Sequence, residues 1–445
     1  METETSPREQ YHQKLVTPTA AAELVQTGDM VTVTGGSMQP FGFLAALSRR
    51  RDLRRVTVSS SMSLLPADFL VRQFAAAARG EAVEREIRWS SVLVGPGTGE
   101  GVATGVVDFV PVSLPNLGRA LQGTRLDVLV VGSSGMDEKG NFNLGCNVDW
   151  MPELITSTNL DETLVVVEVN PSLPRTMGTT TFPLRIVDRI LEVPRTPVDL
   201  PVGAERKEAR AIGAFLNGLV PDGATLHLGI GDLVSQAASL LDGKRDLGLH
   251  SDLISDVALH LRDRGALTGK LKVHFPGRWV GSFLLGSRRL YDFANDNPVV
   301  ALHSYDFVTR PENILRNPKV VSISQGVCVD LSGQVATQSS QMEFASHPGV
   351  LRTFHSAAAS SPGGAGIVVL PSVSALGRGT NVVDVLPAGS AVGIPRDEVD
   401  VVVTEHGIAR LRGATLPERA LAMISVAHPK WRDALAARAR KAGLL

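Results

Sequence analysis

A carboxylate at the end of an expected strand is the first candidate for chemistry. Residues 246–256 read DLGLHSDLISD, and the residues before His250 predict a strand that ends at Leu249. Such a strand delivers His250, Ser251 and Asp252 to the carboxyl edge of an α/β sheet, where ligands bind. Asp252 is then a candidate nucleophile or general base. The same letters also fit the start of a helix with Ser251 as N-cap, and spacing alone favours that second interpretation.

A pair of glycines marks a second candidate. Gly229 and Gly231 follow an expected strand and precede an expected helix, the context in which glycines let backbone N–H groups approach a phosphate. Val234 stands where the third glycine of a dinucleotide-binding fingerprint would be, so that fingerprint is incomplete. A tight turn between strand and helix explains the two glycines equally well.

Other chemical signatures are missing from the sequence. It contains no G-x-S-x-G motif of a serine hydrolase and no H-E-x-x-H or C-x-x-C motif that would support a metal site. The segment 265–270 (GALTGK) is one residue too short for a P-loop. We therefore expect no metal ion.

The segments that must position these residues alternate as in an α/β protein, with short apolar runs between longer amphipathic segments. Strands are expected at 127–131, 164–169, 226–228, 366–370 and 399–403. Helices are expected at 20–26, 42–50, 206–217, 232–242, 255–264, 416–424 and, after an interruption at Pro429, 431–442.

The two halves of the chain echo each other. Residues 28–47 resemble 222–241, with a turn, a strand, a glycine and a helix in the same order. Residues 127–141 resemble 320–334 at nearly the same offset, which pairs Asp137 with Asp330 and Gly140 with Gly333. Two echoes at nearly the same offset indicate tandem copies of one α/β domain.

The seam between the copies is expected in the proline-rich stretch 194–201. We therefore predict an N-terminal domain of residues 1–195 and a C-terminal domain of residues 202–445. The second domain would carry the candidate carboxylate Asp252.

Composition narrows the class of partner. The chain has 445 residues, 44 Lys and Arg against 45 Asp and Glu, and a net charge of −1, so it offers no electrostatic footprint for nucleic acid or an anionic membrane. Cys146 and Cys328 are its only cysteines, which fits a reducing compartment. No long apolar run or secretory leader is evident. We expect a cytoplasmic protein that binds a small molecule.

Several motifs, in the same order along nearly the whole chain, resemble the acetyl-CoA hydrolase and transferase family, whose members include 4-hydroxybutyrate and succinate CoA-transferases. The matching stretches are 11–14, 28–29, 137–145 (DEKGNFNLG), 168–170, 174–178 (PRTMG), 222–231 (DGATLHLGIG), 247–256 (LGLHSDLISD), 330–335 (DLSGQV), 402–413 (VVTEHGIARLRG) and 427–429. The resemblance implies two open α/β domains of the CoA-transferase type in tandem. It also implies a coenzyme A thioester as substrate, no permanently bound cofactor, and a homo-oligomer.

The resemblance assigns the central role to Asp252. Family members use a glutamate in a segment like GLHSEM, and Asp252 stands at that position. In that role the carboxylate attacks an acyl-CoA thioester, and the enzyme then carries the coenzyme A as its own thioester. Aspartate is shorter by about 1.5 Å. A displacement of about 1 Å can cost on the order of 10²-fold where positioning governs the step.

Other positions depart from the family pattern. Where relatives carry a segment like GQVNAES, this chain has Ala336 in place of an amide and Gln338 in place of an acid. Where relatives carry a glycine pair that helps to stabilise an oxyanion, this chain has Gly349 followed by Val350. These changes suggest that the reaction is altered or lost.

The site expected from the resemblance has two groups of residues. Asp252 and Gly349 are expected to be catalytic. The residues expected near the substrate and coenzyme A are Gly229, Gly231, His250, Gln338, Val350, Glu405 and His406. For Glu405, which lies in a stretch resembling TEYG, a buried structural role is an equal alternative.

Four functions remain open at this point. The chain could transfer coenzyme A from a small acyl-CoA to a carboxylic acid, or hydrolyse the thioester with Asp252 as general base. It could also be a non-catalytic acyl-CoA-binding homologue, or a protein that runs a diverged reaction on the same scaffold.

Overall fold

The computed structural model describes residues 6–83, 85–121, 125–156, 160–200, 203–340, 343–344, 349–374 and 379–445. The chain divides into two compact units. The first comprises Met1–Leu200 and Ser282–Asp306, and the second comprises Pro201–Gly281 and Phe307–Leu445. Each unit is built around its own mainly parallel sheet, which confirms the predicted α/β fold class.

A seven-stranded sheet forms the centre of the first unit, and all neighbouring strands are parallel. The strand order is β11 (Arg189–Glu192), β8 (Leu164–Val169), β5 (Val128–Ser133), β1 (Met30–Val33), β2 (Val56–Ser60), β3 (Ile87–Ser91) and β4 (Val107–Phe109). Every residue of β5 is buried. Such continuous burial is typical of a parallel strand covered on both faces.

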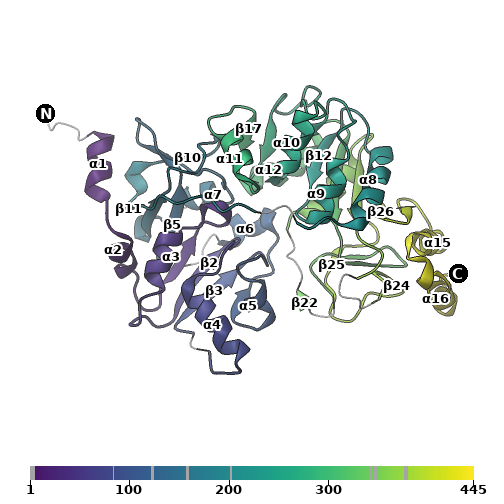
Figure 1. Ribbon diagram of the computed structural model, residues 1–445, viewed down its shortest axis with the longest axis horizontal. Coiled ribbons are helices and arrows are strands. Elements are labelled where there is room, and N and C mark those ends of the chain that lie inside the picture. Colours follow the sequence, from purple (N-terminus) through teal and green to yellow (C-terminus); the bar gives the residue numbers. More distant parts are fainter. Residues whose placement is uncertain are drawn as a thin grey trace. The chain divides into compact units, whose positions relative to one another are not determined.

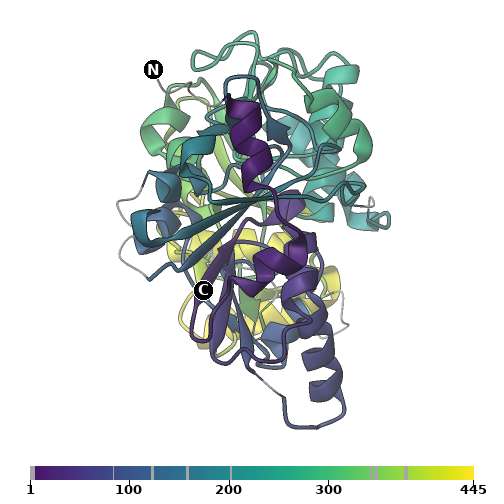
Figure 2. The ribbon, with the colours of Figure 1, turned by 90° about the vertical axis from the view of Figure 1, so that its left-hand side faces the viewer.

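Helices supply the other half of this core. Phe43 on α3 (Phe41–Leu47), Leu70 on α4 (Asp68–Ala78) and Trp89 on β3 belong to one buried cluster. At the N-terminal end, α1 (Pro7–Lys14) packs against β11, as Figures 1 and 2 allow the reader to follow from the purple end of the chain. The other helices of this unit are α2 (Pro18–Glu23), η1 (Gly36–Met38), α5 (Gly99–Ala103), α6 (Leu114–Leu121), α7 (Met151–Ile155), η2 (Leu160–Glu162), η3 (Leu184–Ile186) and α11 (Arg288–Ala294).

One segment departs from the predicted division at 195 and 202. Residues 282–306, which we assigned to the second domain, return to the first unit. There β17 (Val300–Leu302) pairs in parallel with β9 (Met177–Gly178). The hydroxyl of Tyr291 also hydrogen-bonds with Ser37 at 2.8 Å and donates to the carbonyl of Val198 at 3.2 Å. These long-range pairings cannot be read from local sequence patterns.

The second unit contains a six-stranded sheet in which four neighbouring pairs are parallel and the last pair is antiparallel. Its order is β13 (Gly248–Leu249), β12 (Thr225–Leu228), β18 (Val320–Gln325), β23 (Ala365–Val369), β26 (Val401–Thr404) and β27 (Gly407–Arg410). A smaller sheet has the order β24 (Val382–Val383), β19 (Cys328–Asp330), β20 (Val335–Ala336) and β25 (Val392–Ile394).

Helices again complete this core. The helix α14 (Leu351–Ser360) packs against β18 and β23, while α15 (Leu416–Val426) and α16 (Pro429–Lys441) pack on each other near the C-terminus (Figure 1). The other helices of this unit are α8 (Lys207–Leu219), α9 (Asp232–Ser239), α10 (Asp256–Asp263) and α13 (Pro311–Leu315). The last helix begins at Pro429 rather than two residues later, because proline is favoured in the first turn of a helix.

The echo seen in the sequence corresponds to equivalent structure. In the first unit β1 pairs in parallel with β5, and in the second β12 pairs in parallel with β18. Past β5, Asp137 accepts a hydrogen bond from the amide of Asn141 at 2.8 Å. Past β18, Asp330 accepts the same bond from the amide of Gln334 at 3.0 Å. The paired aspartates therefore close the same kind of turn in both units.

Within the described parts of the chain, no helix is both long enough and apolar enough to span a bilayer.

Candidate active site

Asp252 lies at the carboxyl edge of the second sheet, beside a small cavity. The strand β13 ends at Leu249 as predicted, and α10 begins only at Asp256 with Ser255 as its N-cap. The alternative interpretation, with Ser251 as a helix N-cap, is therefore wrong. The cavity has a volume of about 60 Å³. Its lining residues are His227, Gly229, Ile230, Asp252, Ser324, Gln325, Thr337, Gly349, Val350 and Leu351.

A buried histidine holds the Asp252 carboxylate. His227 Nε2 lies 3.2 Å from Asp252 Oδ1, and His227 Nδ1 lies 2.8 Å from the hydroxyl of Ser322. His227 and Ser322 are register partners on the parallel strands β12 and β18, so their side chains project from the same face. All three side chains are almost fully buried. The result is a continuous chain of polar groups that begins in the core and ends at the cavity.

The direction of these hydrogen bonds follows from the chemistry of the groups. An ionised carboxylate only accepts hydrogen bonds, so His227 Nε2 must donate to an ionised Asp252. In a neutral imidazole the other nitrogen then accepts, and Ser322 donates its hydroxyl proton to Nδ1. The imidazole ring itself stacks on Phe354, with 3.9 Å between ring centroids and an interplanar angle of 5°. The stacking fixes the ring plane, and the hydrogen bond fixes Oδ1.

Backbone contacts fix the segment that carries Asp252. The hydroxyl of Ser251 accepts from the amide of Leu228 and donates to the carbonyl of the same residue, each at 3.2 Å. The amide of Ser251 donates to the carbonyl of Val280 at 3.0 Å. The buried Ser251 thus connects the ends of β12 and β13 through hydrogen bonds, and the residue that follows it is Asp252.

His250 points away from the cavity. Its Nε2 lies 2.8 Å from the carbonyl of Val308, and it does not line the cavity. Burial, followed by the nearby charge of Lys272, lowers the pKa of His250 to about 3, so the ring is neutral. The structure therefore places His250 beside the site as a support and not in contact with the cavity.

The two predicted glycines occupy different places at the end of β12. Gly229 lines the cavity, and a Cβ there would lie 3.2 Å from the backbone Cα of Ser324. Gly231 is the N-cap of α9 with φ 139°, a conformation that disfavours a side chain, and it is not among the lining residues. Gly229 therefore allows two neighbouring strand ends to approach closely.

The remaining predicted residues separate into two places. Gly349 and Val350 line the cavity, at the start of α14. Gln338 is half-buried and lies outside the lining, although its neighbour Thr337 contributes to it. Gly349 has φ 54°, a conformation that favours glycine.

Glu405 and His406 belong to the turn between β26 and β27, outside the cavity lining. The carboxylate of Glu405 accepts from the amide of Ser372 at 2.9 Å and also from the hydroxyl of that serine. His406 Nε2 lies 3.5 Å from the Glu405 carboxylate. These contacts favour the structural interpretation of Glu405.

Sequence reasoning missed His227, Ser322 and Phe354. The signal for His227 was its position in TLHL, where all four residues are buried, because a buried polar group needs a partner. The identity of that partner depends on the register between β12 and β18, which no motif revealed. Among the described residues, no group of His, Cys, Asp and Glu is arranged to hold a metal ion.

Comparison with known proteins gives a consistent result. Residues 1–200 match the acetyl-CoA hydrolase/transferase N-terminal domain, and residues 286–439 match the C-terminal domain of the same family. The chain is 33% identical over 427 residues to 4-hydroxybutyrate coenzyme A transferase of Clostridium kluyveri, covering 96% of this chain and 97% of that protein. It is 34% identical over 438 residues to succinyl-CoA:cyclohexane-1-carboxylate CoA transferase of Geobacter metallireducens, covering 98% of this chain and 97% of that protein.

A solved structure agrees over the full length. The crystal structure of RipA from Yersinia pestis matches with a TM-score of 0.89 and 27% sequence identity, covering 99% of this chain and 100% of that one. The resemblance predicted from the sequence motifs is thereby confirmed, and the chain belongs to the acetyl-CoA hydrolase/transferase family.

Proposed function

We propose that this protein transfers coenzyme A from a small acyl-CoA to a carboxylic acid, with Asp252 as the nucleophile. The observation that carries the proposal is the buried Asp252 carboxylate at the edge of the cavity, held by a histidine on one oxygen. The second oxygen, Oδ2, makes no hydrogen bond with any described residue. It is the atom we assign to attack on the thioester.

The reaction follows in two exchanges that balance in atoms and charge. Oδ2 of Asp252 attacks the thioester carbonyl carbon, the C–S bond breaks, and a mixed anhydride and a coenzyme A thiolate form. The thiolate then attacks Cγ of Asp252 and releases the acyl group as a carboxylate. The enzyme now carries coenzyme A as a thioester on Asp252. An incoming carboxylic acid repeats both steps in reverse and leaves with the coenzyme A.

His227 acquires a defined role in this sequence. When a thiolate or carboxylate attacks Cγ of Asp252, negative charge develops on Oδ1, the atom 3.2 Å from His227 Nε2. A donor already aimed at that atom stabilises the charge without reorganisation. We assign His227 as this donor, and Ser322 as the residue that fixes its tautomer.

Hydrolysis is the second candidate, because the same pair can serve a water molecule. A carboxylate that is oriented by a histidine and borders a cavity of about 60 Å³ can activate a water that attacks the thioester. The shorter side chain of aspartate leaves room for that water, which keeps hydrolysis as the second candidate.

An acceptor experiment separates the two reactions. The protein is incubated with a panel of small acyl-CoAs, with and without a carboxylic acid, and products are measured by mass spectrometry. Transfer predicts new acyl-CoA only when the acid is present. Hydrolysis predicts free coenzyme A without it. An unchanged panel in both conditions would contradict the proposed function and leave a binding protein.

A further inference from the structure

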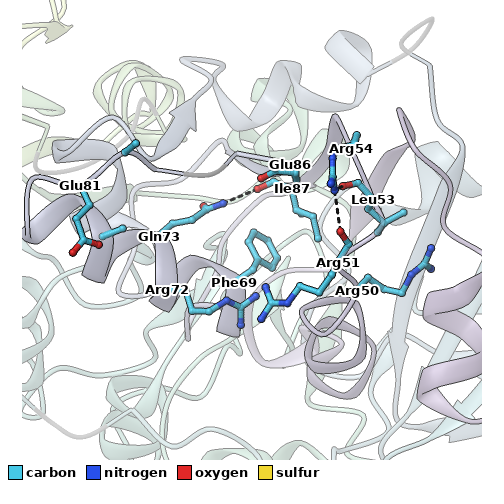
Figure 3. A pocket seen from close by; sticks show the side chains of 12 residues that line it. Arg50, Arg51, Leu53, Arg54, Phe69, Arg72, Gln73, Glu81, Glu86 and Ile87 are labelled. Atoms are coloured by element: carbon cyan, nitrogen blue, oxygen red, sulfur yellow. Dashed lines mark hydrogen bonds between the residues drawn. The ribbon is translucent and has the colours of Figure 1, made fainter.

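A cavity in the first unit lies at the amino edge of its sheet. It has a volume of about 510 Å³, within the range of small-ligand pockets. Its walls come from the residues just before β2, the residues at the start of β3, and one face of α4 (Figure 3). Asp252 and its cavity belong to the other unit, so this cavity is not part of the site described above.

Four arginines line this cavity: Arg50, Arg51, Arg54 and Arg72. Arg50 is neutralised by Asp52, which it contacts through Nε at 2.7 Å and Nη2 at 2.6 Å. Arg51 and Arg72 form no ion pair with any described residue. The charge of Asp68 acts on Arg72 but forms no ion pair with it, so both guanidinium groups are left without a direct carboxylate partner.

The acidic residues of the lining do not remove this excess. Glu81 already binds Arg79, with its two oxygens 2.7 and 2.8 Å from the guanidinium nitrogens. Glu86 is the other acid of the lining. Within the lining, Glu86 is thus the one carboxylate without an arginine partner among the described residues. It stands against Arg51, Arg72 and Arg54, the last of which donates to the carbonyls of Arg51 and Leu53.

The two uncompensated groups converge. Figure 3 shows the guanidinium groups of Arg51 and Arg72 pointing toward each other below the ring of Phe69. Burial and then the charge of Arg51 lower the pKa of Arg72, which is the effect expected of two neighbouring like charges. Arg72 is held in this position by a hydrogen bond from its Nη2 to the carbonyl of Ser48 at 2.8 Å. An anion between the two guanidinium groups would turn this repulsion into two attractions.

The wall behind the arginines is apolar. Leu53, Phe69 and Ile87 line the cavity and are 2%, 4% and 6% exposed. The side chain of Gln73 is fixed there by its bond to the carbonyl of Ile87 at 2.9 Å. Such a wall suits the flat or apolar part of an organic anion.

From these observations we infer a second binding site, for a small organic phosphate whose phosphate group lies between Arg51 and Arg72 and whose apolar part rests on Phe69 and Ile87. Guanidinium forks match the oxygens of phosphate in pairs, and a phosphate carries more charge than one carboxylate. The inference does not depend on the proposed reaction, because no residue of this cavity belongs to the second unit.

Binding is measured by calorimetry with adenosine 5′-monophosphate as the probe, on the full chain at low salt. We expect saturable binding that weakens as sodium chloride is added. The double variant Arg51→Gln/Arg72→Gln should bind at least about 10-fold more weakly, the loss expected for charge-assisted hydrogen bonds. Arg49→Gln is the control for the loss of positive charge, because this exposed arginine lies outside the lining; it removes one charge where the double variant removes two.

The ligand-free proteins provide a second readout. If the two arginines form an anion site, the double variant should melt within a few degrees of the parent, because the repulsion that is removed offsets the lost hydrogen bond from Arg72 to the carbonyl of Ser48. Earlier melting without a change in affinity would show a structural role and overturn the inference. Equal weakening in Arg49→Gln, no binding of the probe, or binding of citrate in place of the phosphate would overturn it as well.

Discussion

Replacing His227 by phenylalanine removes the hydrogen bonds that link Asp252 to Ser322 while keeping an aromatic ring at this position. The variant His227→Phe retains a ring that can stack on Phe354, which lies 3.9 Å away between ring centroids. It loses the donor to Asp252 at 3.2 Å and the acceptor for Ser322 at 2.8 Å. The predicted effect therefore comes from two hydrogen bonds rather than from packing.

The size of the effect can be estimated for each partner. Removing a donor from an atom that becomes an oxyanion costs about 10²- to 10³-fold in kcat. The hydroxyl of Ser322 has no exposure to water and would be left without its imidazole partner, which costs about 1–3 kcal/mol of folding stability. We expect kcat to fall by about 10²-fold or more and the melting temperature to fall by several degrees.

Two further variants separate the effects on activity and stability. His227→Gln keeps an N–H donor on a side chain of similar reach, so it should recover part of the lost kcat. His355→Gln is the control, because His355 is equally buried in the same unit but accepts the amide of Asp400 at 3.2 Å. It should lower the melting temperature and leave kcat near that of the parent.

The assay is the exchange of coenzyme A between an acyl-CoA and a carboxylic acid, followed at saturating substrate, with melting by circular dichroism. If His227→Phe melts earlier but retains kcat within about threefold, the donor role assigned to His227 is refuted. Equal activity of His227→Phe and His227→Gln would refute it too, since only the latter has a donor.

Four other changes test the surrounding structure. Asp252→Asn should lower kcat by about 10³-fold or more at an unchanged melting temperature, whereas an active variant would exclude a nucleophilic role. Asp252→Glu should also lose activity. The carboxylate is already 3.2 Å from His227, so a side chain about 1.5 Å longer must displace the imidazole ring. Faster transfer than in the parent would show that the short side chain of Asp252 itself limits the reaction. Gly229→Ala should reduce activity and stability, because its Cβ would lie 3.2 Å from the Cα of Ser324. In the control Gly218→Ala the new Cβ has nothing within 4 Å, so this variant should be as stable as the parent or more stable. Similar losses in both variants would contradict this. Lys272→Met tests a pH dependence, because burial lowers the pKa of Lys272 to about 7 in the folded protein. Between about pH 7 and pH 10 the free energy of unfolding of the parent, measured with urea, should therefore rise relative to that of the variant by up to about 1.4 kcal/mol per pH unit. A difference that does not change with pH would contradict this.

Much of the fold was predictable because local patterns decide it. The expected strands lie within two residues of β5, β8, β12, β23 and β26. The echo between Asp137 and Asp330 was also informative, since both aspartates close equivalent turns. The return of residues 282–306 to the first unit was not predictable, because it depends on pairing between β17 and the distant β9.

The candidate site shows the same limit. The position of Asp252 at a strand end followed from the apolar run before it, but the choice between strand end and helix start required the structure. The partnership of His227 with Ser322 depends on inter-strand register, and that with Asp252 depends on how two strand ends meet. His250 illustrates the reverse error, since proximity in sequence to Asp252 did not bring its side chain to the cavity.

Oxygen labelling tests the central claim most directly. The protein is incubated with an acyl-CoA and a carboxylic acid in which both oxygens are ¹⁸O, and the peptide that contains Asp252 is then analysed by mass spectrometry. Transfer through an anhydride on Asp252 leaves one ¹⁸O atom in its side chain after each turnover, so this peptide should gain about 2 Da and no other peptide should. New acyl-CoA formed with no label in the Asp252 peptide would contradict the account.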